Sequence, residues 1–347
     1  MKAKALQFGK AMSAALFVLL LVVVGSKNAL AQTQVATLQH GDDVSVFYGQ
    51  NAFVEAHDAA ATGDIITLSS GTFVPTTITK AITLRGAGCA VDTVAHTNPT
   101  IFGGNITLNV ADTDNFLTIE GILFTNSVIY KTLYNPKFNR CDFTEITYED
   151  YNYHDEMHNA QFVNCIINSF YFFQSRATVL INSVVWQSDG LNVNETAVVL
   201  YNSIIHVKQA DNLSANNSII IRTDSYYGPY STCSFVNCIG IYTGTGNGTA
   251  FGSVNQSGYT TGCINYTSYE EVFESFRGDF SLEELFILKD EIATGFLGTD
   301  GTQAGIYGGF MPYSNRPTYM VMKHCNVANK STIDGKLSVD IEVVTEE

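Results

Sequence analysis

The chain has 347 residues, a net charge of −15 and a 46% share of hydrophobic residues. So much apolar sequence excludes a disordered acidic protein. The negative charge argues against nucleic acid or anionic lipid as a partner, because their phosphates would be repelled.

The first 31 residues have the pattern of a secretory signal peptide. Three lysines precede an apolar or small run over residues 11–25, and Ala29-Leu30-Ala31 is a typical cleavage signal. The run is shorter than the roughly 20 residues that cross a bilayer. We expect residues 1–31 to be removed and the mature chain, without a transmembrane segment, to be exported to the periplasm, the cell surface or the medium.

Residues 51–61 are predicted to form a short amphipathic helix, ended by Thr62-Gly63, that caps the fold behind it. Strands are predicted over 64–68, 72–74 and 78–84, because these runs are apolar and bounded by turn residues.

A repeated pattern dominates the middle of the chain. An asparagine, a Cys or Ser and two apolar residues recur, with the asparagines at positions 164, 182, 202, 217 and 237. Weaker copies of the pattern place further positions equivalent to these asparagines, or slots, at 120, 140 and 262. Steps of 15 to 20 residues without helical sequence predict an all-β, right-handed parallel β-helix over residues 32–311. About eight or nine coils would stack about 4.8 Å apart.

Two columns should follow from this stacking. The asparagine amides would bond one another from coil to coil, as in other stacked strands. The next slot accepts Cys or Ser, so we interpret it as a packing position. The seven cysteines have irregular spacing, which predicts buried free thiols rather than a disulfide framework.

The two apolar residues of each repeat should face opposite sides of a strand. One of each pair would then point outward and form an apolar column, which Asp142 interrupts at its early end. We expect a loop or the strand over 337–343 to cover this column. The sharper hypothesis is a surface for self-association or for a partner.

Toward the C-terminus, one or two helical turns are predicted over 269–276, and the glycine-rich stretch 300–309 could close the far end of the coils. Residues 312–347 are predicted to form a C-terminal two-stranded unit. Its strands are predicted over 320–327 and 337–343, with a turn at Asp334-Gly335 between them.

Six short motifs are spread over nearly all the mature chain. They are Gly63-Asp64-Ile65-Ile66-Thr67-Leu68, Gly71-Thr72-Phe73, Ile82-Thr83-Leu84-Arg85-Gly86, Asp300-Gly301-Thr302, Gly305-Ile306-Tyr307-Gly308-Gly309 and Asp334-Gly335-Lys336-Leu337. Together they resemble secreted right-handed parallel β-helix proteins of the pectate-lyase-like superfamily, of the type common in Bacteroidetes. The resemblance implies the fold and export, and leaves the activity open, because the fold hosts lyases, hydrolases and adhesins alike.

The richest polar stretch, residues 145–158, lies in the longest step of the repeat and should bulge out as a loop. Its two histidines are four residues apart and could chelate a metal if helical, but no third ligand is identifiable, so no metal site is predicted. Its tyrosines could stack on sugar rings. A merely solvated acidic loop is the alternative. The candidate binding residues are Glu149, Asp150, Tyr151, Tyr153, His154, Asp155, His158, Arg176, Arg222, Tyr226 and Tyr227.

Hydrolysis by two carboxylates needs them about 5–10 Å apart, and the central coils offer no acidic pair at coil spacing. We therefore predict an exported, non-catalytic β-helix that binds a glycan or another surface partner and uses no cofactor. Two alternatives stay open. One is a polysaccharide lyase or glycoside hydrolase acting on acidic polysaccharide, with Ca²⁺ in the lyase case. The other is a purely structural or adhesive surface rod.

Overall fold

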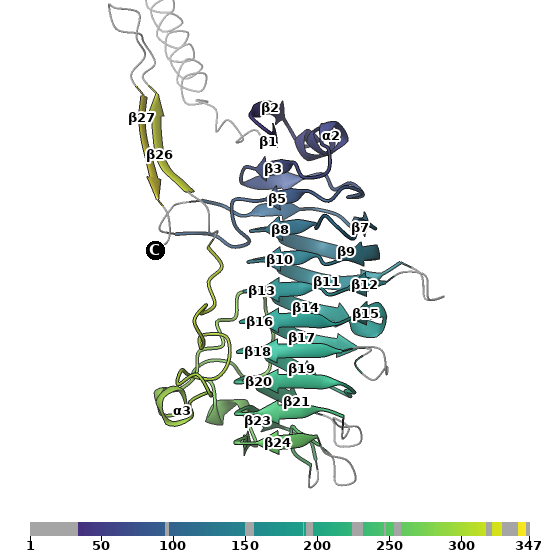
Figure 1. Cartoon of the computed structure of the whole chain (residues 1–347). Coiled ribbons are helices and arrows are strands. Elements are labelled where there is room, and N and C mark those ends of the chain that lie inside the picture. The colour runs from purple at the N-terminus through teal and green to yellow at the C-terminus, as the bar shows by residue number, and fades with distance from the viewer. Residues whose placement is uncertain are drawn as a thin grey trace, which may run out of the picture. The chain divides into compact units, whose positions relative to one another are not determined.

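The computed structural model describes residues 34–93, 97–149, 156–189, 191, 197–223, 232–245, 248–252, 258–316, 321–327 and 339–344. Most of these residues form a parallel β-helix of about eight turns, which confirms the predicted fold (Figure 1). The predicted signal peptide lies outside the described residues. Within the described part of the chain, no helix is long and apolar enough to cross a membrane.

Two long sheets build the coils. Among the described residues the first sheet has 12 strands, and its pairings from β3 onward are parallel. In spatial order its strands are β2 (Asp43–Tyr48), β1 (Val35–His40), β3 (Ile65–Leu68), β5 (Thr83–Arg85), β8 (Thr118–Glu120), β10 (Lys137–Asn139), β13 (Gln161–Val163), β16 (Thr178–Ile181), β18 (Val198–Tyr201), β20 (Leu213–Asn216), β22 (Ser234–Val236) and β24 (Tyr259–Thr261).

The second sheet has 13 described strands and bends around the rest of each coil. Its strands are β4 (Gly71–Phe73), β6 (Thr100–Phe102), β7 (Ile106–Val110), β9 (Leu123–Tyr134), β11 (Asp142–Tyr148), β12 (Met157–His158), β14 (Ile166–Tyr171), β15 (Ser175–Arg176), β17 (Val184–Asp189), β19 (Ile204–Val207), β21 (Ile219–Arg222), β23 (Ile239–Tyr242) and β25 (Ile264–Tyr266). The strands predicted over 64–68 and 72–74 are confirmed. The one predicted over 78–84 is reduced to an isolated bridge at Ile78 followed by β5.

A left-handed backbone corner between the two sheets explains the asparagine repeat. All five repeat asparagines have φ between 46° and 54°. Asparagine adopts this region more readily than other non-glycine residues, because its short polar side chain can bond locally. Gly121, Arg140 and Gly262 occupy the same corner in flanking coils, with φ of 66°, 49° and 65°. The slot predicted at 120 is therefore wrong by one residue.

The prediction that these asparagine amides bond one another is also wrong. None of the five, all of them described, shares a side-chain hydrogen bond with another. The corner turns the side chains of Asn182, Asn202, Asn217 and Asn237 away from the core, and these four meet residues 297–309. Asn182 Nδ2, for example, donates to the Gly308 carbonyl at 2.8 Å. A coil-to-coil amide bond exists at a second left-handed corner, where Asn159 Nδ2 donates to Asn135 Oδ1 at 3.0 Å.

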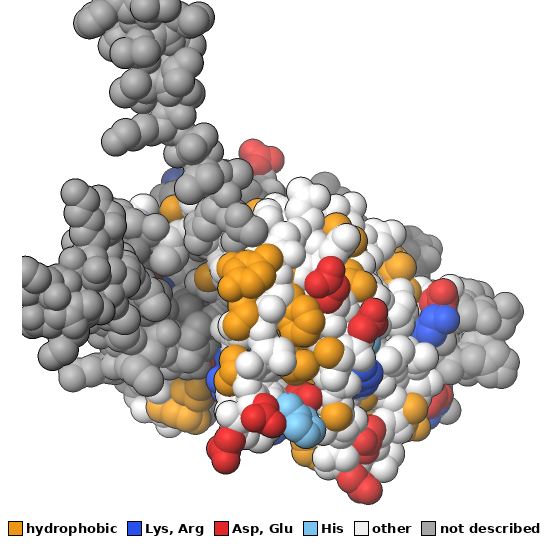
Figure 2. Space-filling view, turned by 90° about the horizontal axis from the view of Figure 1, so that it is seen from above, with side chains coloured by type: hydrophobic (Ala, Val, Ile, Leu, Met, Phe, Trp, Pro, Cys, Tyr) orange, Lys and Arg blue, Asp and Glu red, His pale blue; other side chains and the backbone are white. Residues whose placement is uncertain are grey.

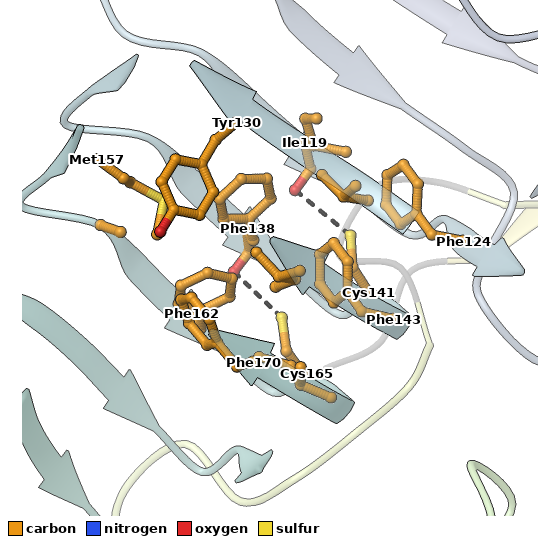
Figure 3. Packing of buried hydrophobic residues seen from close by; sticks show 14 of the residues in the cluster. Ile119, Phe124, Tyr130, Phe138, Cys141, Phe143, Met157, Phe162, Cys165 and Phe170 are labelled. Atoms are coloured by element: carbon orange, nitrogen blue, oxygen red, sulfur yellow. Dashed lines mark hydrogen bonds between the residues drawn. The ribbon is translucent and has the colours of Figure 1, made fainter. Parts of the chain in front are cut away.

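The Cys/Ser slot carries the ladder that the asparagines do not. The backbone N–H of Ser183 donates to Ser203 Oγ at 3.1 Å, and that of Ser203 donates to Ser218 Oγ at 3.1 Å. Cys141 and Cys165 sit in the same slot, and their thiols donate to carbonyls of the preceding coil (Figure 3). The slot is therefore a bonding position and not only a packing position.

The predicted free thiols are confirmed for the cysteines whose side chains are described. They are Cys89, Cys141, Cys165, Cys233, Cys238 and Cys263.

Stacked phenylalanine rings fill much of the interior (Figure 3). Phe124 and Phe143 lie 4.8 Å apart between ring centroids, as do Phe138 and Phe162, in nearly parallel orientation. Because the same inward position recurs in each coil, like side chains stack on like, and each ring extends the core by one coil.

The N-terminal cap contains the predicted helix and a hairpin that was not predicted. Helix α2 (Ala52–Ala59) buries Phe53 completely against Phe102, with ring centroids 4.9 Å apart. Strands β1 and β2 pair antiparallel and close the first edge of the sheet. Seen from the cap end, apolar side chains gather on the surface beside carboxylates (Figure 2). Val44, Val46 and Tyr48 of β2 are exposed there.

Residues 267–316, here named the covering segment, pack on the outward apolar column (Figure 1). The segment contains a 3₁₀ turn (Tyr269–Glu271) and helix α3 (Asp290–Gly295). The column residues Ile166, Val184, Ile204 and Ile219 are at most 2% exposed. These four residues of the column are therefore covered, as expected.

The structure bears on three predictions for the C-terminal region. The column is covered by the covering segment and not by the strand over 337–343. The stretch 300–309 lies along the side of the coils, on the asparagine corner, and not over their far end. The two-stranded unit itself is confirmed as β26 (Val321–Val327) and β27 (Val339–Val344), paired antiparallel, and its turn lies outside the described residues.

Candidate functional site

Asp142 is a carboxylate in an apolar column. It begins β11 and pairs in register with Leu123 on one side and Ile166 on the other. All three side chains belong to the outward column, which the period-2 alternation of the strand dictates. Asp142 is only 4% exposed, because the last residues of the covering segment and the loop after β5 lie over it. The predicted interruption of the column is thus also a buried acid.

A cavity of about 380 Å³ opens in front of Asp142. Its volume falls within the range of small-molecule sites in proteins. Three parts of the chain form its wall: the loop after β5, the outward column and the covering segment. The lining residues are Cys89, Ala90, Val91, Pro99, Leu123, Asp142, Ile166, Leu282, Glu283, Glu284, Leu285, Tyr313 and Asn315.

Burial changes the acidity of the groups around this cavity. It raises the pKa of Asp142 from 3.8 to about 7, although hydrogen bonds from the Cys89 thiol and the Ile166 backbone oppose the rise. Asp142 Oδ1 is buried without a hydrogen-bond partner. Burial also raises the pKa values of the Cys89 thiol and the Tyr313 phenol. Cys89 is therefore a thiol near neutral pH and a poor nucleophile.

The cavity is better equipped to bind than to catalyse. A carboxyl with a pKa near 7 can donate or accept a proton at neutral pH. Glycoside hydrolysis requires a second carboxylate, and the positions of the adjoining coils that pair with Asp142 hold Leu123 and Ile166. The other acidic residues that line the cavity, Glu283 and Glu284, belong to the covering segment. The Glu284 carboxylate accepts from the backbone N–H groups of Leu285 and Phe286 at 3.1 and 3.2 Å. The lining residues that the structure describes include no lysine or arginine to act as a lyase base.

A second group of polar side chains lies on three consecutive coils, where strands β9, β12 and β15 end. Tyr134, His158 and Arg176 occupy equivalent positions of β9, β12 and β15. The Tyr134 and His158 rings stack with centroids 4.7 Å apart. Arg176 Nη2 donates to Glu156 Oε1 at 2.6 Å, and Glu156 Oε2 lies 2.7 Å from His158 Nε2. We name these four residues the Tyr134 row.

Of the four predicted site residues that the structure describes, it brings together His158 and Arg176, through Glu156. Glu149 instead forms an ion pair with Lys131. Arg222 is fully buried, and its guanidinium donates to the carbonyls of Thr249 and Gly252. Arg222 therefore lies in the interior of the coils and not on their outer face. Seven of the candidates lie outside the described residues: Asp150, Tyr151, Tyr153, His154, Asp155, Tyr226 and Tyr227.

Sequence reasoning had one signal for the cavity, the break that Asp142 makes in the apolar repeat. Nothing in the sequence connects Asp142 with Cys89 or Tyr313, which come from non-repeating segments. Tyr134 belongs to the row but was not among the predicted residues, because it lies before the polar stretch.

Among the described residues, no group of three or more His, Cys, Asp or Glu side chains is placed to hold a metal ion. A scan against protein-family models and a search of curated proteins both found no match, so similarity to other proteins assigns neither a family nor an activity.

Proposed function

We propose that this protein is an exported, non-catalytic β-helix that binds a glycan on the outer face of its coils, at the Tyr134 row. Membership of the pectate-lyase-like superfamily, of the type common in Bacteroidetes, is part of this proposal and rests on the resemblance of the sequence motifs. Export rests on the signal-peptide pattern of residues 1–31.

The single observation that carries the proposal is the stacked Tyr134 and His158 pair beside the Glu156–Arg176 ion pair. Sugars are bound by aromatic faces, which contact their apolar C–H groups, and by planar polar groups, which bond their hydroxyls. All four residues of the row are partly exposed. Because each coil contributes one position of the row, a saccharide chain could lie along it.

The ligand we propose is a neutral glycan. Arg176 and Glu156 offset each other, and the chain as a whole carries a net charge of −15. A polyanionic saccharide would therefore meet long-range repulsion with no local excess of positive charge to offset it. For this electrostatic reason we rank the lyase and hydrolase alternatives behind the binding function.

A glycan array followed by titration of the best ligand tests the proposal. Tyr134→Ala and Arg176→Ala should each weaken binding roughly tenfold, as truncation of a central contact does. Arg277→Ala is the matched control, because this exposed arginine of the covering segment also pairs with a glutamate. An array without any bound glycan would contradict the proposal and favour the structural rod. Turnover of an acidic polysaccharide that stops on chelation of Ca²⁺ would favour the lyase.

A further inference from the structure

The Asp142 cavity is separate from the Tyr134 row, and its chemistry points to a different ligand. We propose that it binds a small organic ammonium ion, an amine whose charged group meets Asp142 and whose apolar body fills the rest of the cavity.

The first observation is an unsatisfied acceptor. Asp142 is 4% exposed and Oδ1 is buried without a hydrogen-bond partner, while the side chain lines an open volume of about 380 Å³. Buried polar atoms in proteins are almost always bonded, and an exception at a cavity marks a place for a donor from outside. An ammonium group supplies up to three N–H donors and a positive charge.

The second observation is the charge of the wall. Asp142, Glu283 and Glu284 are acidic, and the described residues that line the cavity include no lysine, arginine or histidine. A cation therefore meets no like charge there, whereas an anion would meet only carboxylates. The acidic residues of the wall, taken alone, would attract a metal ion equally well. Ca²⁺, however, requires six to eight oxygen ligands, and Glu284 is already bound by two backbone N–H groups.

The third observation is the apolar remainder of the wall. Leu123 and Ile166 flank Asp142 in register, and Leu282 and Leu285 of the covering segment line the cavity with them. A strongly hydrated ion would leave these surfaces in water. An amine with a hydrocarbon body would bury them and place its charge against Asp142.

Five titratable groups line the cavity: Asp142, Cys89, Tyr313, Glu283 and Glu284. The thiol and the phenol stay neutral near pH 7, because burial raises both of their pKa values. Only the ionised form of Asp142 attracts an ammonium ion, so binding should weaken as the pH falls and Asp142 is protonated. Below pH 7 the affinity should fall by about tenfold per pH unit.

Isothermal titration of the full mature chain with cyclohexylamine, at pH 8 and pH 5, tests the proposal. Cyclohexanol, cyclohexanecarboxylate and Ca²⁺ are the comparison probes. We expect the amine to bind more tightly than the alcohol at pH 8, to lose about 50-fold or more of its affinity at pH 5, and the carboxylate not to bind. Asp142→Asn should remove the preference for the amine and the pH dependence together.

Asp43→Asn, the same change at an exposed position of the cap, is the matched control and should bind as the parent does. Thermal unfolding shows that each variant is folded, and the amine should raise the melting temperature of the parent but not of Asp142→Asn. Equal binding of cyclohexanol and cyclohexylamine, binding of the amine that is insensitive to Asp142→Asn, or tighter binding of Ca²⁺ than of the amine would each overturn the proposal. The outcome does not depend on glycan binding at the Tyr134 row.

Discussion

Asp142→Asn should stabilise the folded protein, and the gain should grow with pH. The folded-state pKa of Asp142 is about 7, against an ordinary value of 3.8 that we take for the unfolded chain. The native state therefore holds this proton more tightly than the unfolded state. Stability that is present below pH 4 is lost as the pH rises toward 7, and the loss levels off above pH 7. Asparagine keeps the shape of the neutral acid and has no charge to lose.

The size of the effect follows from the two pKa values. The gain from Asp142→Asn should be about 1.5–2 kcal/mol at pH 5 and about 4 kcal/mol at pH 8, on the scale of 1.36 kcal/mol per pKa unit. For a chain of this length a gain of 4 kcal/mol corresponds to a rise of roughly 8 °C in melting temperature. Thermal and urea unfolding of the parent and the variant across pH 5–8 measure it, with Asp43→Asn as control. A gain that is absent at pH 8, or constant over this range, would show that ionised Asp142 has a partner and would refute the reasoning.

Local features of the coil stack and of the covering segment give three more expectations. Ser203→Ala removes a rung of the ladder and leaves a buried N–H without a partner, so it should cost about 1–3 kcal/mol in urea unfolding, whereas Ser203→Cys should be tolerated. Gly308→Ala should loosen the covering segment and increase binding of a hydrophobic dye, because its Cβ would lie 1.8 Å from a backbone carbonyl oxygen. Gly295→Ala meets no atom within 4 Å and is the control. Hydrogen bonding with Cys238 lowers the pKa of the partly exposed Cys263 to about 7, so iodoacetamide at pH 7.5 should label Cys263 before the five buried cysteines Cys89, Cys141, Cys165, Cys233 and Cys238. Faster labelling of a buried thiol would contradict this.

The fold could be predicted from the repeat, because the same backbone corner imposes the same residue preference on every coil. A left-handed corner favours asparagine or glycine, and the next position must be small enough to bond across coils. Period-2 alternation then fixes which apolar residue points in and which points out. These are local rules, so they could be read from residues 164 to 237 without any knowledge of the rest of the chain.

The partners of the repeat could not be read in the same way. Whether an asparagine side chain meets its neighbour or a distant segment depends on what packs outside the corner, and residues 297–309 have no periodicity that reveals their position. The stretch is rich in glycine, and the structure shows one reason: a Cβ at Gly298 would lie 2.6 Å from the Asn217 side chain. The same limit applies to the cavity. Asp142 was visible as a break in the pattern, but Cys89 and Tyr313 reach it through loops.

The stability that the folded protein loses by burying Asp142 is evidence about the role of this residue. The equivalent positions of the adjoining coils hold leucine and isoleucine, and burying such a side chain contributes about 1.5–3 kcal/mol. An aliphatic residue at position 142 would gain this term and avoid a further cost of about 4 kcal/mol from the buried charge at pH 8. Core packing alone would therefore not place an aspartate here. A carboxylate that lowers stability and faces an open cavity is explained if a positively charged ligand occupies that space, because the ligand offsets the same desolvation that makes the empty site unfavourable.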